Sequence, residues 1–355
     1  MIGLEQRPTF HSENQTLLDR RAALGLLAAA VTPRAVLADD AVETAARKEG
    51  AVTWYVAQMD AEAAEEMGRR FTAAYPGITV AVIRTTGQVA YQRLLLEIKN
   101  AAPQCDILST TDISHMPALR ERNALLAYQP PNASALLPEF LRLSDPGWFY
   151  VTSATNHFIT YNTRKVATSE APRSWSDLLD PRWKNQTALP HPGFSGCGGV
   201  WALGLRKLYG WEYFEKLAAN NPRIGRSFND PVTLITAGEC MVGPGPANAV
   251  YPSIEKGNPL GIAYPSDGCS LCVAPSAIPA TAPHPNAARL FLNWMLGADY
   301  AQSAIERGSE ASRHGLTSRP GRPSLETLPI LRLSVAEIRA GVPEVIEQWR
   351  ETFGS

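Results

Sequence analysis

The first half of the chain alternates short apolar runs with longer segments whose apolar residues recur at helical spacing. The apolar runs are rich in β-branched and aromatic residues, which favours strands, and they cover residues 51–56, 79–84 and 105–109. After each run come a polar turn and an amphipathic segment, at 60–74, 89–100 and 113–121. Strand, turn and helix repeated in this way predict parallel strands with right-handed crossovers. In such sheets ligands bind beyond the carboxyl ends of the strands.

A Pro-rich connection at 128–138 leads into a second half with the same alternation. We expect extended runs at 148–152 and 157–161, and then a second α/β set. Its expected strands are 187–189, 240–242, 261–264 and 270–274, and its expected helices are 199–209, 212–220, 286–296, 300–307 and 336–353. The sequence therefore predicts an α/β protein of two lobes joined by extended crossovers near residues 150–160 and 262–272.

Composition and charge limit the choice of partners. The chain has 355 residues, 45% of them hydrophobic, which is enough for a packed core and suggests two domains. Its 33 Lys and Arg residues balance 34 Asp and Glu residues, giving a formal net charge of -1. This charge predicts neither nucleic acid nor an anionic membrane as a partner.

The beginning of the chain has the block structure of an export signal. Arg20 and Arg21 precede an Ala-rich apolar block at 22–31, and Ala38 ends a small-residue segment suited to cleavage. The block is too short for a membrane-spanning helix, which needs about 20 apolar residues. The paired arginines favour a twin-arginine signal, and an ordinary secretory signal is the alternative. Both interpretations place the protein outside the cytoplasm.

The five cysteines do not indicate a disulfide-built scaffold. Cys269 and Cys272 have the spacing of a redox pair, but they fall in an expected strand rather than at a helix N-terminus, so we interpret them as structural. No second Cys or His pair stands at zinc-ligand spacing, so no metal site is predicted.

A small-residue turn precedes the expected helix at 199–209. It reads Ser195-Gly196-Cys197-Gly198-Gly199. Such a turn exposes backbone N–H groups at the positive end of the helix dipole, and Ser195 adds a hydroxyl, which together predict an anion site. A capped helix start without a ligand is the alternative.

Several motifs in a fixed order carry a resemblance over nearly the whole mature chain. They are Val52-Thr53-Trp54-Tyr55, Arg84-Thr85-Thr86-Gly87, Cys105-Asp106-Ile107-Leu108-Ser109, Thr160-Tyr161-Asn162, Trp175-Ser176-Asp177-Leu178, Pro192-Gly193-Phe194-Ser195-Gly196, Gly238-Glu239, Ala263-Tyr264-Pro265-Ser266-Asp267-Gly268 and His284-Pro285-Asn286-Ala287-Ala288. In this order the chain resembles the extracellular solute-binding proteins of ABC importers, in the two-lobed class of ferric-ion, phosphonate and sugar-phosphate binders.

The resemblance implies a type II periplasmic-binding-protein fold, with a mainly parallel sheet flanked by helices in each lobe and a hinge between the lobes. It implies an export signal at 1–38, a discontinuous N-terminal lobe at 39–150 plus about 265–300, a C-terminal lobe at 151–264, and C-terminal helices at 301–355 that pack on the lobes. The expected protein is a monomer without a cofactor that delivers a small anionic solute to the permease subunits of an ABC transporter.

Expected ligand-binding residues come from both lobes. They are Gln58, Thr85, Thr86, Gly87, Thr110, Thr111, Asp112, Ser195, Gly196, Cys197, Asn229, Asn248 and Tyr251. The first seven lie at expected strand ends and supply mostly neutral donors, although Thr-rich turns also serve as helix caps. Arg84 and Arg226 are candidate counter-charges for an anion.

Ferric iron is the main alternative ligand. Ferric binders of the resembling class carry two adjacent tyrosines, whereas this chain has Val250 before Tyr251. Because Val250 cannot coordinate a metal, we expect an organic anion, a phosphorylated, phosphonate or carboxylate compound, rather than iron.

A secreted serine hydrolase is the enzyme alternative. Residues 193–197 approach the Gly-x-Ser-x-Gly nucleophile turn, but Cys197 stands where the last glycine is required. We therefore expect no catalytic residues.

Overall fold

The strands form one large mixed sheet and one small parallel pair. In the large eight-stranded sheet the order is β2-β1-β3-β9-β4-β7, with β10 paired to β9 and β8 paired to β4, while β5 pairs with β6. The strands are β1 (Ala51–Val56), β2 (Thr79–Arg84), β3 (Ile107–Ser109), β4 (Tyr150–Asn162), β5 (Ala188–Pro190), β6 (Arg223–Gly225), β7 (Val242–Pro246), β8 (Leu260–Ala263), β9 (Cys269–Ala277) and β10 (Ile330–Leu331). The structure is a computed structural model that describes residues 33–354, with side chains from Asp40 onward.

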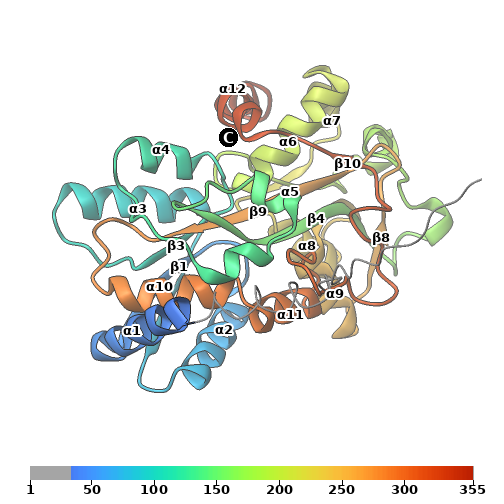
Figure 1. Ribbon diagram of the computed structural model, residues 1–355. Helices are drawn as coiled ribbons and strands as arrows, with labels where there is room; N and C mark the ends of the chain where they lie inside the picture. Colours follow the sequence, from blue (N-terminus) through green and yellow to red (C-terminus); the bar gives the residue numbers. More distant parts are fainter. Residues whose placement is uncertain (1–32, 355) are drawn as a thin grey trace, which may run out of the picture. The chain divides into compact units, whose positions relative to one another are not determined.

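Helices follow most of the strands along the chain (Figure 1). They are α1 (Pro33–Glu49), α2 (Ala61–Ala74), α3 (Gly87–Lys99), α4 (His115–Glu121), α5 (Pro138–Arg142), α6 (Gly196–Tyr209), α7 (Glu212–Ala219), α8 (Asp230–Thr236), α9 (Ala247–Glu255), α10 (Pro285–Met295), α11 (Ala298–Glu306) and α12 (Val335–Phe353). Short 3-10 turns lie at Pro131–Ala135, Thr168–Glu170, Trp175–Leu179 and Pro181–Trp183. The sequence pattern predicted most of these helices but missed α5, α8 and α9.

The predicted strand-turn-helix repeats are confirmed. β1 pairs in parallel with β2 and with β3, so the carboxyl ends of the three strands meet at one edge of the sheet. Neighbouring residues of β1 point to opposite faces, where Trp54 packs against Phe291 of α10 and Tyr55 joins the core beneath α3 and α4. Both faces of this part of the sheet are therefore covered by helices, as Figure 1 shows.

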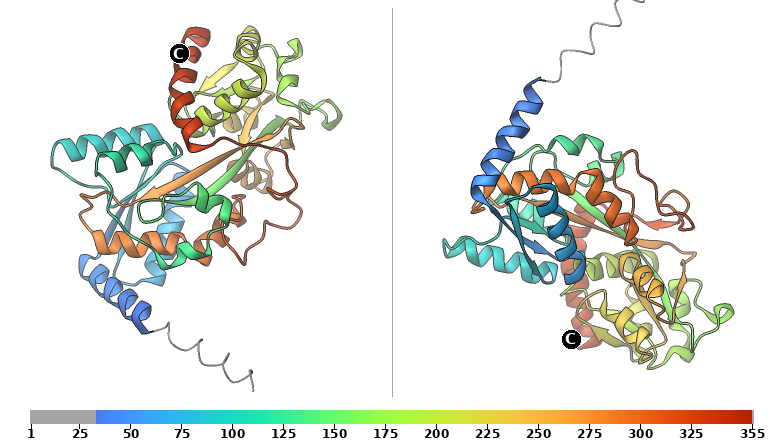
Figure 2. Two further views of the ribbon diagram at one scale, coloured as in Figure 1. Left: turned by 45° about the horizontal axis from the view of Figure 1, so that its top comes forward. Right: turned by 90° about the horizontal axis from the view of Figure 1, so that it is seen from below.

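The two extended runs expected near 148–152 and 157–161 are one continuous strand. β4 is buried along its whole length and pairs antiparallel with β9 over Tyr150–His157, then with β7 and β8 beyond it. A register shift between Val151 and Ser153 interrupts the pairing with β9. The polar residues between the two apolar runs hid the continuity, because a strand buried on both faces need not alternate. β4 and β9 run side by side in the left view of Figure 2.

A second aromatic core lies at α6, α7 and α12. Trp201 of α6 and Trp349 of α12 both pack edge-on against Phe214 of α7. α12 thus joins the second half of the chain through apolar burial, and its start is fixed by a capping box between Ser334 and Glu337.

Residues from Val42 onward form one compact unit. In the part of the chain that the structure describes, no helix combines the length and apolarity needed to cross a membrane. Arg20, Arg21 and the apolar block of the expected export signal lie outside the described residues, and the expected cleavage position at Ala38 falls within α1.

Candidate functional site

A cavity of about 50 Å³ lies where the carboxyl ends of β1, β2 and β3 face the middle of β4 and β9. We call it the central cavity. It is lined by Ala57, Gln58, Arg84, Thr86, Gly87, Thr111, Ser153, Ala154, Thr155, His157, Ser195, Cys197, Ser227, Phe228, Asn229, Pro246, Asn248, Cys272, Val273 and Ala274. The volume corresponds to a few water molecules, which is the size of a small anionic group.

Three strand ends of the first half supply one side of the central cavity. Gln58 follows β1, Thr86 and Gly87 follow β2, and Thr111 follows β3. A Cβ at Gly87 would lie 2.8 Å from the Thr110 hydroxyl oxygen, so only glycine lets α3 start this close to the turn after β3. The predicted location at the carboxyl ends of parallel strands is where the structure has the cavity.

The N-terminus of α6 supplies the opposite side. Ser195 is the N-cap, and its Oγ accepts a hydrogen bond of 3.3 Å from the Gly198 N–H. The helix start is therefore capped, while the Ser195 hydroxyl proton remains free to be donated into the cavity that Ser195 lines. A Cβ at Gly196 would lie 2.4 Å from the Thr111 carbonyl oxygen, so α6 begins in direct contact with the turn after β3.

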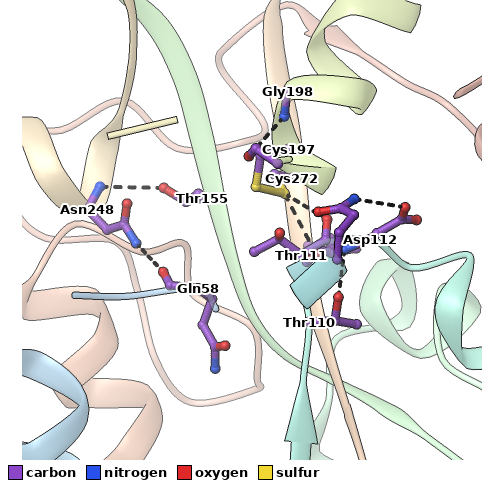
Figure 3. The surroundings of a disulfide bond; sticks show 12 residues. Gln58, Thr110, Thr111, Asp112, Thr155, Cys197, Gly198, Asn248 and Cys272 are labelled. Atoms are coloured by element: carbon purple, nitrogen blue, oxygen red, sulfur yellow. Dashed lines mark hydrogen bonds between the residues drawn. A yellow bond between two sulfur atoms is a disulfide. The ribbon is translucent and has the colours of Figure 1, made fainter. Parts of the chain in front are cut away.

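Asn248 connects the two sides. Its Nδ2 donates to the Gln58 carbonyl oxygen at 3.0 Å, and its backbone N–H donates to Thr155 Oγ1 at 3.4 Å (Figure 3). Asn248 lies on α9 and Gln58 just after β1, 190 positions apart in sequence. These contacts bring the segment after β1, the strand β4 and the helix α9 to one point.

Several polar atoms around the central cavity have no hydrogen-bond partner in the described structure. They are Gln58 Nε2, Thr86 Oγ1 and both ring nitrogens of His157. His157 is fully buried on β4 and stacks on Phe228 with ring centroids 3.9 Å apart. Burial lowers the pKa of His157 to about 3, so the imidazole is neutral and carries one N–H donor. Unpaired buried polar atoms are costly, and a ligand in the cavity would give them partners.

The charge of the lining has one sign. Arg84 carries a permanent positive charge, and its Nε donates to the Met59 carbonyl oxygen at 3.1 Å. No Asp or Glu belongs to the lining among the residues the structure describes. Arg226, the other candidate counter-charge, lies over the Phe194 ring at 4.8 Å and outside the lining. The cavity is therefore suited to an anion.

A disulfide forms part of the wall. Cys197 of α6 is bonded to Cys272 of β9, 75 positions away in sequence. Figure 3 shows the bond beside Thr111. The close sequence spacing of Cys269 and Cys272 does not reflect a bond between them, since neighbours three apart on a strand point to opposite faces and Cys269 is a free, buried thiol.

Some predicted ligand residues lie outside the lining. The Thr85 backbone N–H donates to the Val56 carbonyl oxygen at 3.1 Å, and Gly196 lies against the Thr111 backbone. Thr110 bonds through its hydroxyl to His115 Nδ1 at 2.9 Å. Asp112 accepts hydrogen bonds from the backbone N–H and the hydroxyl of Ser114, at 3.0 and 2.6 Å. These bonds hold Thr110 and Asp112 within the turn that leads into α4.

Tyr251 lies in a different cavity, which we call the Glu310 cluster. The residues that line it include Asn156, Tyr251, Tyr264, Glu310 and Arg322. The Tyr251 hydroxyl pairs with that of Tyr264, and Arg322 lies 3.5 Å from the centroid of the Tyr251 ring. The structure therefore does not bring Tyr251 together with the other predicted ligand residues.

Comparison with known proteins shows which family this chain belongs to. Residues 55–302 match the family described as bacterial extracellular solute-binding protein. The chain belongs to this family. The ordered motifs of the sequence predicted it, and the match covers the segments that build the central cavity.

Individual relatives agree with the family. A putative 2-aminoethylphosphonate-binding periplasmic protein of Salmonella paratyphi A is 31% identical over 224 residues, which are 62% of this chain and 60% of the relative. Among solved structures, AfuA from Actinobacillus pleuropneumoniae with fructose-6-phosphate bound has a TM-score of 0.76 at 20% identity, covering 86% of this chain and 99% of AfuA. Iron-bound HitA from Pseudomonas aeruginosa has a TM-score of 0.72 at 20% identity, covering 85% and 99%. These structures establish the fold, a type II periplasmic-binding-protein fold as predicted.

Sequence reasoning missed the contribution of β4 to the central cavity. Ser153, Thr155 and His157 alternate along β4 and face the cavity, and Phe228 covers His157. A histidine within a run of strand-forming residues was the available signal, because a buried imidazole needs partners.

Proposed function

We propose that the protein binds a small organic anion with a phosphonate or phosphate group in the central cavity. The observation that carries this proposal is the lining itself, which combines Arg84 and unpartnered donors with no described carboxylate. An ionised phosphonate needs several donors and a counter-charge in one place. A carboxylate in the lining would repel it.

Each side of the cavity has a distinct part in this binding. Arg84 supplies the counter-charge, and its guanidinium matches the oxygen geometry of the group. The N-terminus of α6 adds the positive end of a helix dipole, with the Ser195 hydroxyl as a donor. His157 donates as a neutral imidazole, while Phe228 offers an apolar surface for the carbon part of the solute.

The relatives support this ligand class. The Salmonella relative is described as binding 2-aminoethylphosphonate, and AfuA was solved with a sugar phosphate. The matched region spans about 60% of the length of the curated relatives, so the solute is transferred to this chain as a proposal. Both named ligands carry the tetrahedral oxyanion that the lining suits.

Ferric iron fits the central cavity less well. Hard cations take carboxylate, phenolate or other oxygen ligands, and the described lining contains neither carboxylate nor phenolate. Tyr251, the single tyrosine at the predicted position, contacts Tyr264 and Arg322 instead. A hydrolase is also less well supported, since His191 Nδ1 accepts from the Gly193 N–H and Ser195 Oγ accepts from the Gly198 N–H.

We further propose that the protein works outside the cytoplasm, after removal of the segment 1–38, as a monomer that delivers its solute to an ABC permease. The expected lobes, 39–150 with 265–300 and 151–264, would close over the solute. The contacts of Asn248 with Gln58 and of Gly196 with the turn after β3 join these two segments and would be made on closure.

Calorimetric titration tests the proposal. The protein lacking residues 1–38, with its disulfide intact, is titrated with 2-aminoethylphosphonate, methylphosphonate, fructose-6-phosphate, citrate and ferric citrate. We expect one site per chain for a phosphonate or phosphate ester, recovered unchanged after binding. Binding of ferric citrate alone, or conversion of the ligand, would overturn the proposal.

A further inference from the structure

The wall of the central cavity also gathers donors of another kind. Cys197 Sγ, Cys272 Sγ and a ring nitrogen of His157 lie within 4.8 Å of one another, and all three residues are buried. Cys272 stands opposite Thr155 in the pairing of β9 with β4, and His157 is two residues beyond Thr155 on the same face. Cys197 approaches that face from the first turn of α6. Three elements distant in sequence therefore converge on one point.

The state of His157 also points to a metal ligand, independently of the distances between the three residues. Both ring nitrogens of His157 lack hydrogen-bond partners, and the side chain is fully buried against the cavity. A neutral imidazole with a free nitrogen lone pair is the form that binds a metal ion. His115 shows the usual alternative, because its Nδ1 is paired with Thr110 Oγ1 at 2.9 Å.

We propose that reduction of the Cys197–Cys272 disulfide converts this wall into a Cys2His site for a thiophilic d10 cation, Zn²⁺ or Cu⁺. Thiolate sulfur and imidazole nitrogen are the ligands that these ions prefer. A Cys2His set would leave a fourth tetrahedral position open on Zn²⁺, and all three ligand residues line the central cavity. The site does not depend on the proposed solute.

The chemistry balances with a named reductant. A dithiol reductant reduces the disulfide by thiol–disulfide exchange, transferring two electrons and two protons and becoming a disulfide itself. Cys197 and Cys272 become thiols, and the cation displaces their two protons as it binds. The disulfide and the metal are thus exclusive occupants of the same two sulfurs.

The test uses Co²⁺ as a spectroscopic probe and Zn²⁺ and Cu⁺ as competitors. The protein lacking residues 1–38 is reduced anaerobically with a phosphine. In this reaction the phosphine takes up the oxygen of one water molecule and becomes a phosphine oxide, while the disulfide becomes two thiols. The phosphine and its oxide are then removed. We expect one Co²⁺ per chain with thiolate-to-cobalt charge-transfer absorption, displaced by Zn²⁺ or Cu⁺, and no such absorption in the oxidised protein. Which ion displaces Co²⁺ at the lower free concentration identifies the preferred cation.

Variants separate this site from other thiols. His157→Leu and Cys197→Ser should each weaken Co²⁺ binding at least about tenfold, which is about 1.4 kcal/mol. Cys269→Ser is the matched control, since Cys269 is a buried thiol on the same strand, and it should bind Co²⁺ as the unchanged chain does. Equal Co²⁺ affinity of His157→Leu and the unchanged chain would overturn the proposal.

Stability measurements cover the case in which reduction loosens the fold. If reduction lowers the melting temperature, Zn²⁺ should raise it again in the unchanged chain and in Cys269→Ser, but not in His157→Leu. A reduced protein that neither binds Co²⁺ stoichiometrically nor gains stability from Zn²⁺ would contradict the assignment. Solute titration of the oxidised protein remains a separate measurement, so the two proposals can fail independently.

Discussion

Asn156 and His157 are neighbours on β4, and both are almost fully buried, yet they face different surroundings. Asn156 points into the Glu310 cluster, where its Nδ2 donates to Glu310 Oε1 at 2.8 Å. His157 points into the central cavity, where neither ring nitrogen has a partner. The amide N–H donor of Asn156 is thus paired with a carboxyl group inside the protein, although its Oδ1 has no partner, whereas His157 has no partner at either nitrogen. The difference indicates which of the two cavities is built to receive a ligand.

Charge separates the two cavities in the same way. The Glu310 cluster contains an acid and a base, with Arg322 against the Tyr251 ring and burial raising the pKa of Glu310 to about 7. The central cavity has Arg84 without a lining carboxylate among the described residues. A carboxyl group beside Arg322 makes the Glu310 cluster less favourable for an anion, whereas the positive charge of Arg84, with no carboxylate in the described lining, favours an incoming anion.

The largest expected effect comes from Arg84. Arg84→Met keeps an unbranched side chain and removes the charge, so we expect affinity for a phosphonate or phosphate ester to fall about 100-fold, or about 2.7 kcal/mol. Arg226→Met is the control, because Arg226 lies over Phe194 outside the lining. Calorimetric titration measures both. Equal losses in the two variants would remove the distinction between Arg84 and a surface arginine.

A methyl group at Gly196 should have the next largest effect. Its Cβ would lie 2.4 Å from the Thr111 carbonyl oxygen, so Gly196→Ala should push α6 away from the turn after β3 and weaken solute binding by about 2 kcal/mol, or about 30-fold. Gly204→Ala, in the same helix, meets Leu331 at an ordinary 3.4 Å and should bind normally. Unaltered binding by Gly196→Ala would show that the contact is not part of the bound state.

The Glu310 cluster should show itself in the pH dependence of stability. The pKa of Glu310 is raised from 4.5 to about 7, so the folded chain holds a proton there that the unfolded chain releases. Its contribution to stability is present below pH 4.5 and is lost as the pH rises through 7, by about 2 kcal/mol between pH 5 and 7. Glu310→Gln should remove this loss in denaturant unfolding. An identical pH profile for Glu310→Gln would contradict the protonated state.

Replacing Asn156 or His157 by leucine should have the smallest effects, but the two variants should change different properties. Asn156→Leu should leave Glu310 without its amide donor and lower the free energy of unfolding by about 1.4 kcal/mol, with solute affinity unchanged. His157→Leu should lower solute affinity about tenfold without loss of stability, because it removes two unpartnered buried atoms. If both variants changed the same quantity, the two faces of β4 would not have separate roles.

The sequence predicted the part of the fold that repeats locally. Strands β1 and β2 begin and end where their apolar runs do, and the turns after β1, β2 and β3 line the central cavity as expected. The periodicity of apolar residues and the residue types of the turns determine such strand-turn-helix repeats. The order of motifs was also sufficient to identify the family, which the match over residues 55–302 confirms.

Features that depend on distant pairing could not be derived in this way. The Cys197–Cys272 bond and its neighbour His157 join α6, β9 and β4, and no sequence spacing links them. The sequence predicted no metal site, because Cys197, Cys272 and His157 do not stand at local ligand spacing. Thr110 and Asp112 have the chemistry of ligand residues, but their turn uses them internally, through His115 and Ser114. Side-chain type predicts what a residue can do, and the fold decides whether its atoms are free.

The central claim is that the open donors around His157 and Arg84 receive a phosphonate or phosphate group. Its most direct test is the phosphorus-31 NMR spectrum of 2-aminoethylphosphonate or fructose-6-phosphate with the oxidised protein and with its Arg84→Met variant. We predict a bound resonance at one ligand per chain with the unchanged protein, and free ligand with the variant at the same concentrations. Free ligand in both samples, or a bound resonance that persists in Arg84→Met, would contradict the claim.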